Sequence, residues 1–100
     1  MSLLLKPEID SFRDHAESID ERVEWQAVIK GNPKPDIKWM KDDTELQKDE
    51  RYDMEEDKRN CKYKLIIKKL SLEDKGIYTV TAKNYLGETS AQATLTPHSK

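Results

Sequence analysis

The chain has 100 residues, a net charge of −2, 38% charged residues and a mean hydropathy of −0.95. This length provides one domain with a single modest core, and the slightly acidic balance argues against a nucleic-acid-binding protein, which would carry a basic stripe. No apolar run approaches the roughly 20 residues of a membrane span, and the run at residues 3–5 is too short for a signal peptide, so we expect neither nucleic acid nor membrane as a partner.

The sequence contains a single cysteine, Cys61, so no internal disulfide can form. We expect its thiol to be inert, because no activating pattern lies near it. An Asn-x-Ser/Thr acceptor is also absent from the sequence, and both absences fit a reducing compartment. Met1 and Ser2 are expected to be an added start, which would make the chain an excised piece of something larger.

Residues 3–10 are predicted to form an edge strand, because Pro7 lacks the N–H group that a central strand needs. Residues 11–22 leave two alternatives open. The near-helical spacing of their apolar residues would fit a helix capped by Ser11. The alternative, which we favour, is a short irregular strand around 14–18 followed by a turn at Asp20 and Glu21.

Alternation of apolar and polar residues predicts the next strands, since side chains of a strand face opposite ways in turn. They are expected at residues 22–30, 36–40, 51–54 and 62–67, with a very short strand at 45–46. A stiff loop of turn formers at 31–35 and a charged hairpin loop at 55–60 separate them. The positions expected to face inward are Val23, Trp25, Ala27, Ile29, Ile37, Trp39, Tyr52, Met54, Tyr63, Leu65 and Ile67.

A polar corner at Asp74 and Gly76 precedes a strand whose inner face carries Tyr78, Val80 and Ala82. A hairpin turn at 84–87 is predicted to hold Gly87 in the left-handed conformation. The last strand is expected at 88–96, with Ala91, Ala93 and Leu95 inward, and is predicted to end at Pro97. Short strands at this regular spacing predict an all-β fold of two antiparallel sheets, with seven to nine strands in a Greek-key sandwich.

Several motifs together resemble the intermediate-set (I-set) immunoglobulin domains of giant muscle proteins such as titin, twitchin and obscurin. They cover roughly residues 23–95 and comprise Gly31-Asn32-Pro33-Lys34-Pro35-x-Ile37-x-Trp39, Leu65-x-Ile67, Asp74-x-Gly76-x-Tyr78-x-Val80-x-Ala82-x-Asn84 and Gly87. The resemblance implies a single immunoglobulin-like domain over residues 1–100, with its core at about 5–96. Gly31, Pro33, Asn84 and Gly87 would be its turn residues.

By that resemblance, Ala27 and Val80 occupy the two core cysteine positions beneath Trp39. A disulfide there would contribute roughly 4 kcal/mol by loop entropy, so this domain must rely on packing, and Trp25 is expected to fill space. The family also joins a basic residue to the corner aspartate, here Arg51 to Asp74. One departure is Asp20, where the family usually has glycine.

The function that the resemblance implies is a non-enzymatic, mechanical and protein-binding module of a cytoplasmic, sarcomeric protein. Its partners would be neighbouring immunoglobulin or fibronectin-like repeats and sarcomeric proteins, while the partner-binding residues and the oligomeric state stay open. Hydrogen bonds between the terminal strands, at residues 5–9 and 88–95, are expected to resist pulling. The parent could carry a separate kinase domain.

Two other function classes stay open, an extracellular adhesion or receptor domain and an α+β enzyme fragment. The missing cysteine pair favours the intracellular module over the first. The second needs the helix at 11–22 and an active site, yet no nucleophile–base pair or phosphate loop can be named. His15 and His98 stand alone, so no catalytic residue, metal site or cofactor is expected.

Overall fold

The computed structural model of the chain describes residues 3–99. The expectation for Met1 and Ser2 concerns residues outside this described part. Within it, the chain forms nine strands and one short 3-10 helix, and the predicted all-β sandwich is confirmed. The elements are β1 (Leu5–Asp10), β2 (His15–Ser18), β3 (Val23–Asn32), β4 (Asp36–Lys41), β5 (Thr44–Glu45), β6 (Tyr52–Asp57), β7 (Lys62–Ile67), η1 (Leu72–Asp74), β8 (Gly76–Asn84) and β9 (Gly87–His98).

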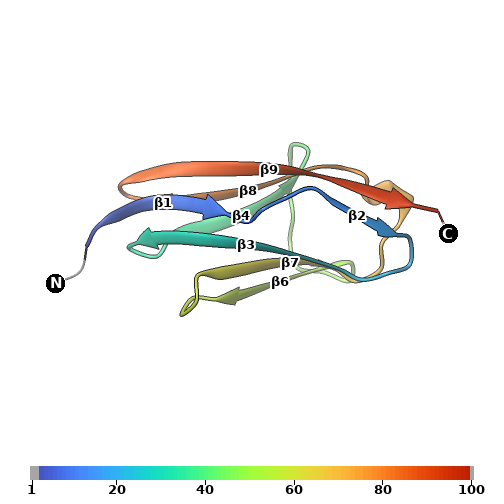
Figure 1. The fold of residues 1–100 in the computed structure, drawn as a ribbon, viewed down its shortest axis with the longest axis horizontal. Helices are drawn as coiled ribbons and strands as arrows, with labels where there is room; N and C mark the ends of the chain where they lie inside the picture. The colour runs from blue at the N-terminus through green and yellow to red at the C-terminus, as the bar shows by residue number, and fades with distance from the viewer. Residues whose placement is uncertain (1–2, 100) are drawn as a thin grey trace.

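The strands form two sheets, ordered β1-β3-β7-β6 and β2-β9-β8-β4-β5, packed face to face (Figure 1). The body is elongated, 52 Å long and about 23 by 22 Å across. The strand β1 starts at one end of the long axis and β9 finishes at the other. Every strand pair is antiparallel except β2 with β9, which is parallel and corrects the purely antiparallel prediction.

The core lies between the sheets and is built from alternate residues of their central strands, as expected for strands with one buried face. One sheet contributes residues of β3 and β7, the other contributes residues of β4, β8 and β9, and Leu70 joins the core from the loop after β7. The buried cluster comprises Val23, Trp25, Ala27, Ile29, Trp39, Tyr63, Leu65, Ile67, Leu70, Tyr78, Val80, Ala82, Ala93 and Leu95. Ile37, Tyr52, Met54 and Ala91 are only partly buried against it.

The segment between β1 and β3 is not a helix. The structure has the short strand β2 there, so the helical alternative for residues 11–22 is wrong. The apolar spacing that suggested a helix has another cause. Phe12 packs against the core from a loop, with its ring centroid 4.9 Å from that of Trp25 and 5.7 Å from that of Trp39. Asp20 has a φ of 73° in the following turn, a left-handed conformation that aspartate tolerates better than most residues and that glycine adopts freely.

Two predictions near the last hairpin are wrong. Gly87 is not in the left-handed conformation, because the side-chain oxygen Oδ1 of Asn84 accepts the N–H of Leu86 at 2.9 Å and closes the turn itself. Pro97 does not end the last strand, since β9 continues to His98. Beyond Leu95, β9 pairs with β2 on one side only, so a residue without an N–H group is tolerated there.

Pro7 is buried on β1, where the register with β3 shifts between Leu5 and Glu8. This strand is an edge of its sheet and the shift is a bulge, so the predicted setting of this proline is confirmed.

Candidate functional site

The parallel pair of β2 and β9 joins the first part of the chain to its last strand. Residues His15 to Ser18 lie opposite Leu95 to His98. Two further bonds extend the pairing at its ends: the N–H of Thr94 donates to Asp14 Oδ1 at 2.8 Å, and the N–H of Ile19 donates to the carbonyl of His98 at 2.8 Å. The expected pairing of residues 5–9 with residues 88–95 is wrong, because β1 lies in the other sheet and pairs with β3.

The corner before β8 holds a buried carboxylate. Asp74 is 0% exposed. Its Oδ1 accepts from Arg51 Nη2 at 2.6 Å and from the Tyr52 hydroxyl at 3.3 Å, while its Oδ2 accepts from the N–H of Ser71 at 2.9 Å. The Tyr78 hydroxyl donates to the Asp74 backbone carbonyl at 2.6 Å. The structure therefore brings Arg51 and Asp74 together and surrounds the charge with donors, the condition under which a buried carboxylate is tolerated.

Two tyrosines at this corner are held in their neutral form. Burial raises the pKa of Tyr78 far above its ordinary value, and the nearby Tyr52 and Asp74 raise it further. Burial also raises the pKa of Tyr52, with the Asp74 charge adding to the effect. The Tyr78 hydroxyl therefore remains a donor in the folded state well beyond the pH at which an exposed tyrosine ionises, and the pKa of Tyr52 is shifted in the same direction.

Gly76 lies directly after this corner and its conformation requires glycine. Its φ of 159° is at the limit of the region that residues with a Cβ rarely adopt. A Cβ at this position would lie 3.2 Å from the carboxylate of Asp42, and that carboxylate accepts the N–H of Ile77 at 3.2 Å.

Ala27 and Val80 occupy opposite sheets and are both fully buried in the core cluster. Trp39 is the cross-strand neighbour of Val80 on β4. Trp25 packs its ring 5.1 Å from that of Tyr78, and its Nε1 donates to the backbone carbonyl of Arg13 at 2.7 Å. The indole thus fills the core while its one polar atom is satisfied.

At the end of the sandwich where β1 begins, asparagine side-chain amides hydrogen-bond to backbone carbonyls. Asn84 Nδ2 donates to the carbonyls of Leu5 at 2.9 Å and Pro33 at 3.1 Å, and Asn32 Nδ2 donates to the carbonyl of Leu3. Gly31 is in tight contact with this loop, since a Cβ there would lie 3.0 Å from the ring of Pro35. Three of the predicted turn residues, Gly31, Pro33 and Asn84, therefore meet at the start of β1.

Across residues 3–99, no group of three or more His, Cys, Asp or Glu side chains could hold a metal ion. The same residues form no helix that is both long and apolar enough to cross a membrane. Cys61 is half-buried at the β6–β7 hairpin with a φ of 60°, and its carbonyl accepts the N–H of Ile29 at 2.8 Å.

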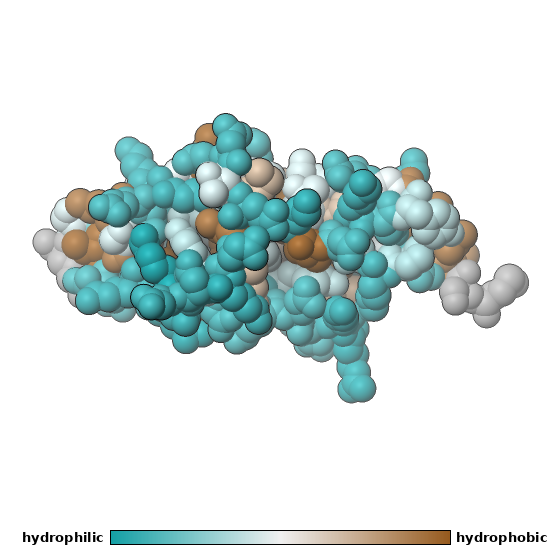
Figure 2. Space-filling view, turned by 180° about the vertical axis from the view of Figure 1, so that it is seen from behind, coloured by the Kyte–Doolittle hydropathy of each residue, from teal (hydrophilic) through white to brown (hydrophobic). Residues whose placement is uncertain are grey.

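The surface is mostly hydrophilic, but hydrophobic side chains also appear at both ends of the long axis and in smaller patches between them (Figure 2). Among the large exposed apolar residues are Leu3, Leu4, Leu5, Leu72, Ile77 and Tyr85. Leu72 and the surface around it were not among the predicted site residues. Their signal in the sequence is an apolar residue in a polar turn, where no strand alternation requires one. Asp14 was not predicted either, because its partner Thr94 is 80 residues away.

The geometry defines an immunoglobulin-type sandwich whose corner tyrosine bonds back to the preceding turn. The family model for the immunoglobulin I-set domain matches residues 8–96. The chain therefore belongs to the immunoglobulin I-set family.

Individual relatives come from two groups of proteins. The chain is 40% identical over 77 residues to human Roundabout homolog 2, covering 77% of this chain and 5% of that protein. It is 38% identical over 84 residues to the titin homolog of Caenorhabditis elegans, covering 84% of this chain and a share of that protein that rounds to 0%. The chain thus spans a very small part of the proteins it resembles.

A solved structure of the titin M10–Obscurin like 1 Ig complex contains a chain similar in fold to this one. The TM-score is 0.89 with 26% sequence identity, over 96% of this chain and 97% of that one.

Proposed function

We propose that this domain is a non-enzymatic, load-bearing and protein-binding module of a multidomain sarcomeric protein of the titin type in the cytoplasm. The observation that carries the mechanical part is the parallel pairing of β2 with β9. In a parallel pair, the start of one strand and the end of the other lie at opposite ends of the ladder. Pulling the two chain ends apart therefore loads all the hydrogen bonds of the pair together, in shear.

The similarity to the titin homolog supports the sarcomeric setting, and the paired immunoglobulin domains of the titin M10–Obscurin like 1 Ig complex support another immunoglobulin domain as partner. The lack of a core cysteine pair supports a reducing cell interior, because Ala27 and Val80 occupy the buried positions where secreted relatives carry a disulfide.

Single-molecule force spectroscopy tests the mechanical role. Ala16→Pro removes an N–H group from the middle of β2, so we expect a marked fall in unfolding force. The matched control is Glu8→Pro on β1, which pairs with β3 and should lower the force less. A larger loss for Glu8→Pro, or an unchanged force for Ala16→Pro, would contradict the assignment of the load to β2 and β9.

A second candidate function is an extracellular adhesion or receptor module. The observation that favours it is the 40% identity to Roundabout homolog 2, which is at least as high as the identity to the titin homolog. Localisation of the full-length parent by antibody distinguishes the two. Striation along myofibrils supports the sarcomeric module, whereas labelling of unpermeabilised cells supports the extracellular one.

A further inference from the structure

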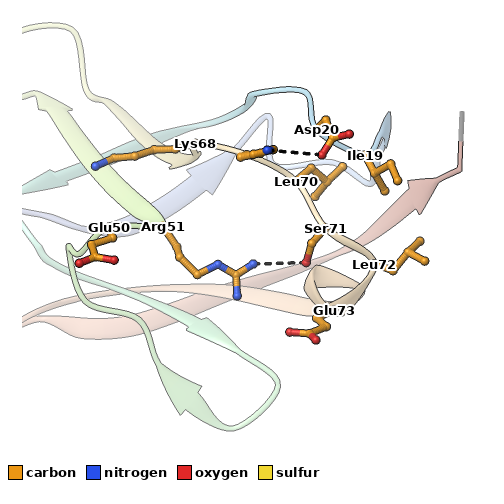
Figure 3. A pocket seen from close by; sticks show the side chains of 10 residues that line it. Ile19, Asp20, Glu50, Arg51, Lys68, Leu70, Ser71, Leu72 and Glu73 are labelled. Atoms are coloured by element: carbon orange, nitrogen blue, oxygen red, sulfur yellow. Dashed lines mark hydrogen bonds and ion pairs between the residues drawn. The ribbon is translucent and has the colours of Figure 1, made fainter.

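A groove opens at the end of the sandwich where β9 finishes. Its volume is about 620 Å³, and apolar side chains contribute to its walls. Figure 3 shows Ile19, Leu70 and Leu72 on one side of the opening, with Arg51 extending toward them. Leu70 is fully buried, and its backbone is fixed because its carbonyl accepts the N–H of Asp20 at 2.7 Å. Leu72 is 58% exposed, so the rim of the groove presents an apolar side chain to solvent.

The opposite end carries an exposed apolar segment, residues 3–5, which we call the leucine leader. Leu3 is 86% exposed and Leu4 is 61% exposed. The leader is nevertheless held in place, because its backbone carbonyls accept hydrogen bonds from the amides of Asn32 and Asn84. A positioned apolar segment loses less conformational freedom on binding than a free one.

Charges at the two ends are complementary. Lys6 follows the leader directly and is exposed, and Glu50 and Glu73 line the groove and are exposed. None of these three side chains has an ion-pair partner among the described residues. Of the groove's three cations, Arg51 binds Asp74 and Lys69 lies 3.9 Å from Asp20, whereas Lys68 donates only to the backbone carbonyl of Asp49 at 3.2 Å. The unpaired charges of Glu50, Glu73 and Lys68 therefore leave the groove with one net negative charge, opposite in sign to that of Lys6 beside the leader.

We propose that two copies of this chain associate end to end, with the leucine leader of one copy seated in the groove of the other. This deepens the function proposed above by naming a partner and a surface. Because the contact joins two different surfaces, it is heterologous and can continue into a row of domains. A three-residue segment buries little area, well below the roughly 1,200 Å² of stable complexes, so the association is weak.

Sedimentation equilibrium of the chain between about 10 µM and 1 mM measures this association, a range suited to contacts of this small size. We expect the apparent mass to rise with concentration for the wild type. The double variant Leu3→Asp with Leu4→Asp makes the leader polar, and Leu72→Asp places a carboxylate at the rim of the groove. Each variant should stay monomeric. Both variants change exposed side chains, so folding should be preserved. Ser90→Asp, at an exposed site on β9, makes the same single charge change as Leu72→Asp, and this control should associate as the wild type does.

Mixing the two variants makes the test specific. The leader variant keeps an intact groove and the groove variant keeps an intact leader, so an equimolar mixture should form one-to-one pairs and nothing larger. Isotope-labelled leader variant would then show NMR shift changes around Ile19 and Leu72 when the unlabelled groove variant is added. Adding unlabelled leader variant to itself should cause none.

A monomeric wild type at 1 mM would overturn the proposal, and so would a mixture that fails to pair. Association retained by both single-surface variants would also overturn it. None of these results affects the mechanical function, which is tested separately by the force response of Ala16→Pro in a single domain.

Discussion

The two ends of the sandwich are held together by different kinds of contact. At the end near η1, a fully buried carboxylate is bonded by Arg51, Tyr52 and Ser71, and Tyr78 closes the same corner. At the other end, the exposed amide of Asn84 joins two backbone carbonyls. Breaking a buried, charged network costs more than breaking an exposed neutral one. We therefore expect the global stability of the domain to depend on the corner and the asparagine end to control local order.

Arg51→Ala should have the largest effect. It leaves the buried Asp74 carboxylate without its cation, and removing one partner of a buried ion pair typically costs 3–5 kcal/mol. The side chain of Arg51 is 45% exposed and Ser71 and Tyr52 remain bonded to the carboxylate, so we expect a loss of about 3 kcal/mol, at the low end of that range. Urea unfolding measures it.

The matched control for that variant is Lys48→Ala. Its ammonium lies 3.8 Å from Asp53, with both side chains well exposed, so we expect a change within about 0.5 kcal/mol. Equal losses for the two variants would remove the distinction between the corner and an ordinary surface pair.

Alkaline pH should have the next largest effect, through the corner tyrosines. Above about pH 10 an unfolded tyrosine loses its proton, whereas the raised pKa keeps Tyr78 protonated in the folded state. The unfolded state then binds fewer protons, so stability falls as pH rises, by up to about 1.4 kcal/mol per pH unit for one such group. Unfolding free energies measured from pH 8 to 11 test this slope.

Tyr78→Phe removes the more strongly shifted of the two corner tyrosines and should reduce the slope of the stability curve above pH 10, while Tyr52 keeps part of that slope. The variant should also be less stable at neutral pH, because the Asp74 carbonyl loses its donor. The control is Tyr85→Phe, which alters a side chain that is 71% exposed and should keep the wild-type slope. A wild-type slope in Tyr78→Phe would assign the alkaline loss to another group.

Asn84→Ala should have the smallest effect on global stability. It removes two neutral, exposed hydrogen bonds to the carbonyls of Leu5 and Pro33 and the acceptor for the N–H of Leu86, which together we expect to cost about 1.5 kcal/mol. Hydrogen exchange should instead show faster opening around β1 and the 84–87 turn, because local opening there needs little of the core to unfold. A global loss as large as that of Arg51→Ala would show that the two ends are equivalent.

The alternation of apolar and polar residues predicted most strands. In a strand with one buried face, every second residue is apolar, as Tyr78, Val80 and Ala82 are, so the strand can be recognised from its own sequence. The pattern failed where distant residues decide the structure. The ring of Phe12 is placed by two tryptophans on other strands, so its spacing imitated a helix. The turn before β9 is closed by the side chain of Asn84, so Gly87 was wrongly predicted to be left-handed.

The candidate surfaces were harder to predict than the fold. The ladder between β2 and β9 joins segments far apart in sequence, and no local pattern in residues 15–18 names their partner. The groove combines Ile19, Arg51 and Leu72, which three separate turns bring together. Which distant residues lie side by side depends on the order of strands in the sheets. The alternation within each strand did not specify that β2 would pair with β9.

The pairing of β2 with β9 also has a consequence for biosynthesis. Within this domain, residues 15–18 are translated well before their partner residues 95–98. Contacts between residues so distant in sequence form slowly, because the chain must lose the entropy of closing a long loop before the contacts stabilise it. The nascent chain therefore cannot complete this ladder until almost all of the domain has been synthesised, and until then residues 15–18 lack a strand partner on both sides instead of on one.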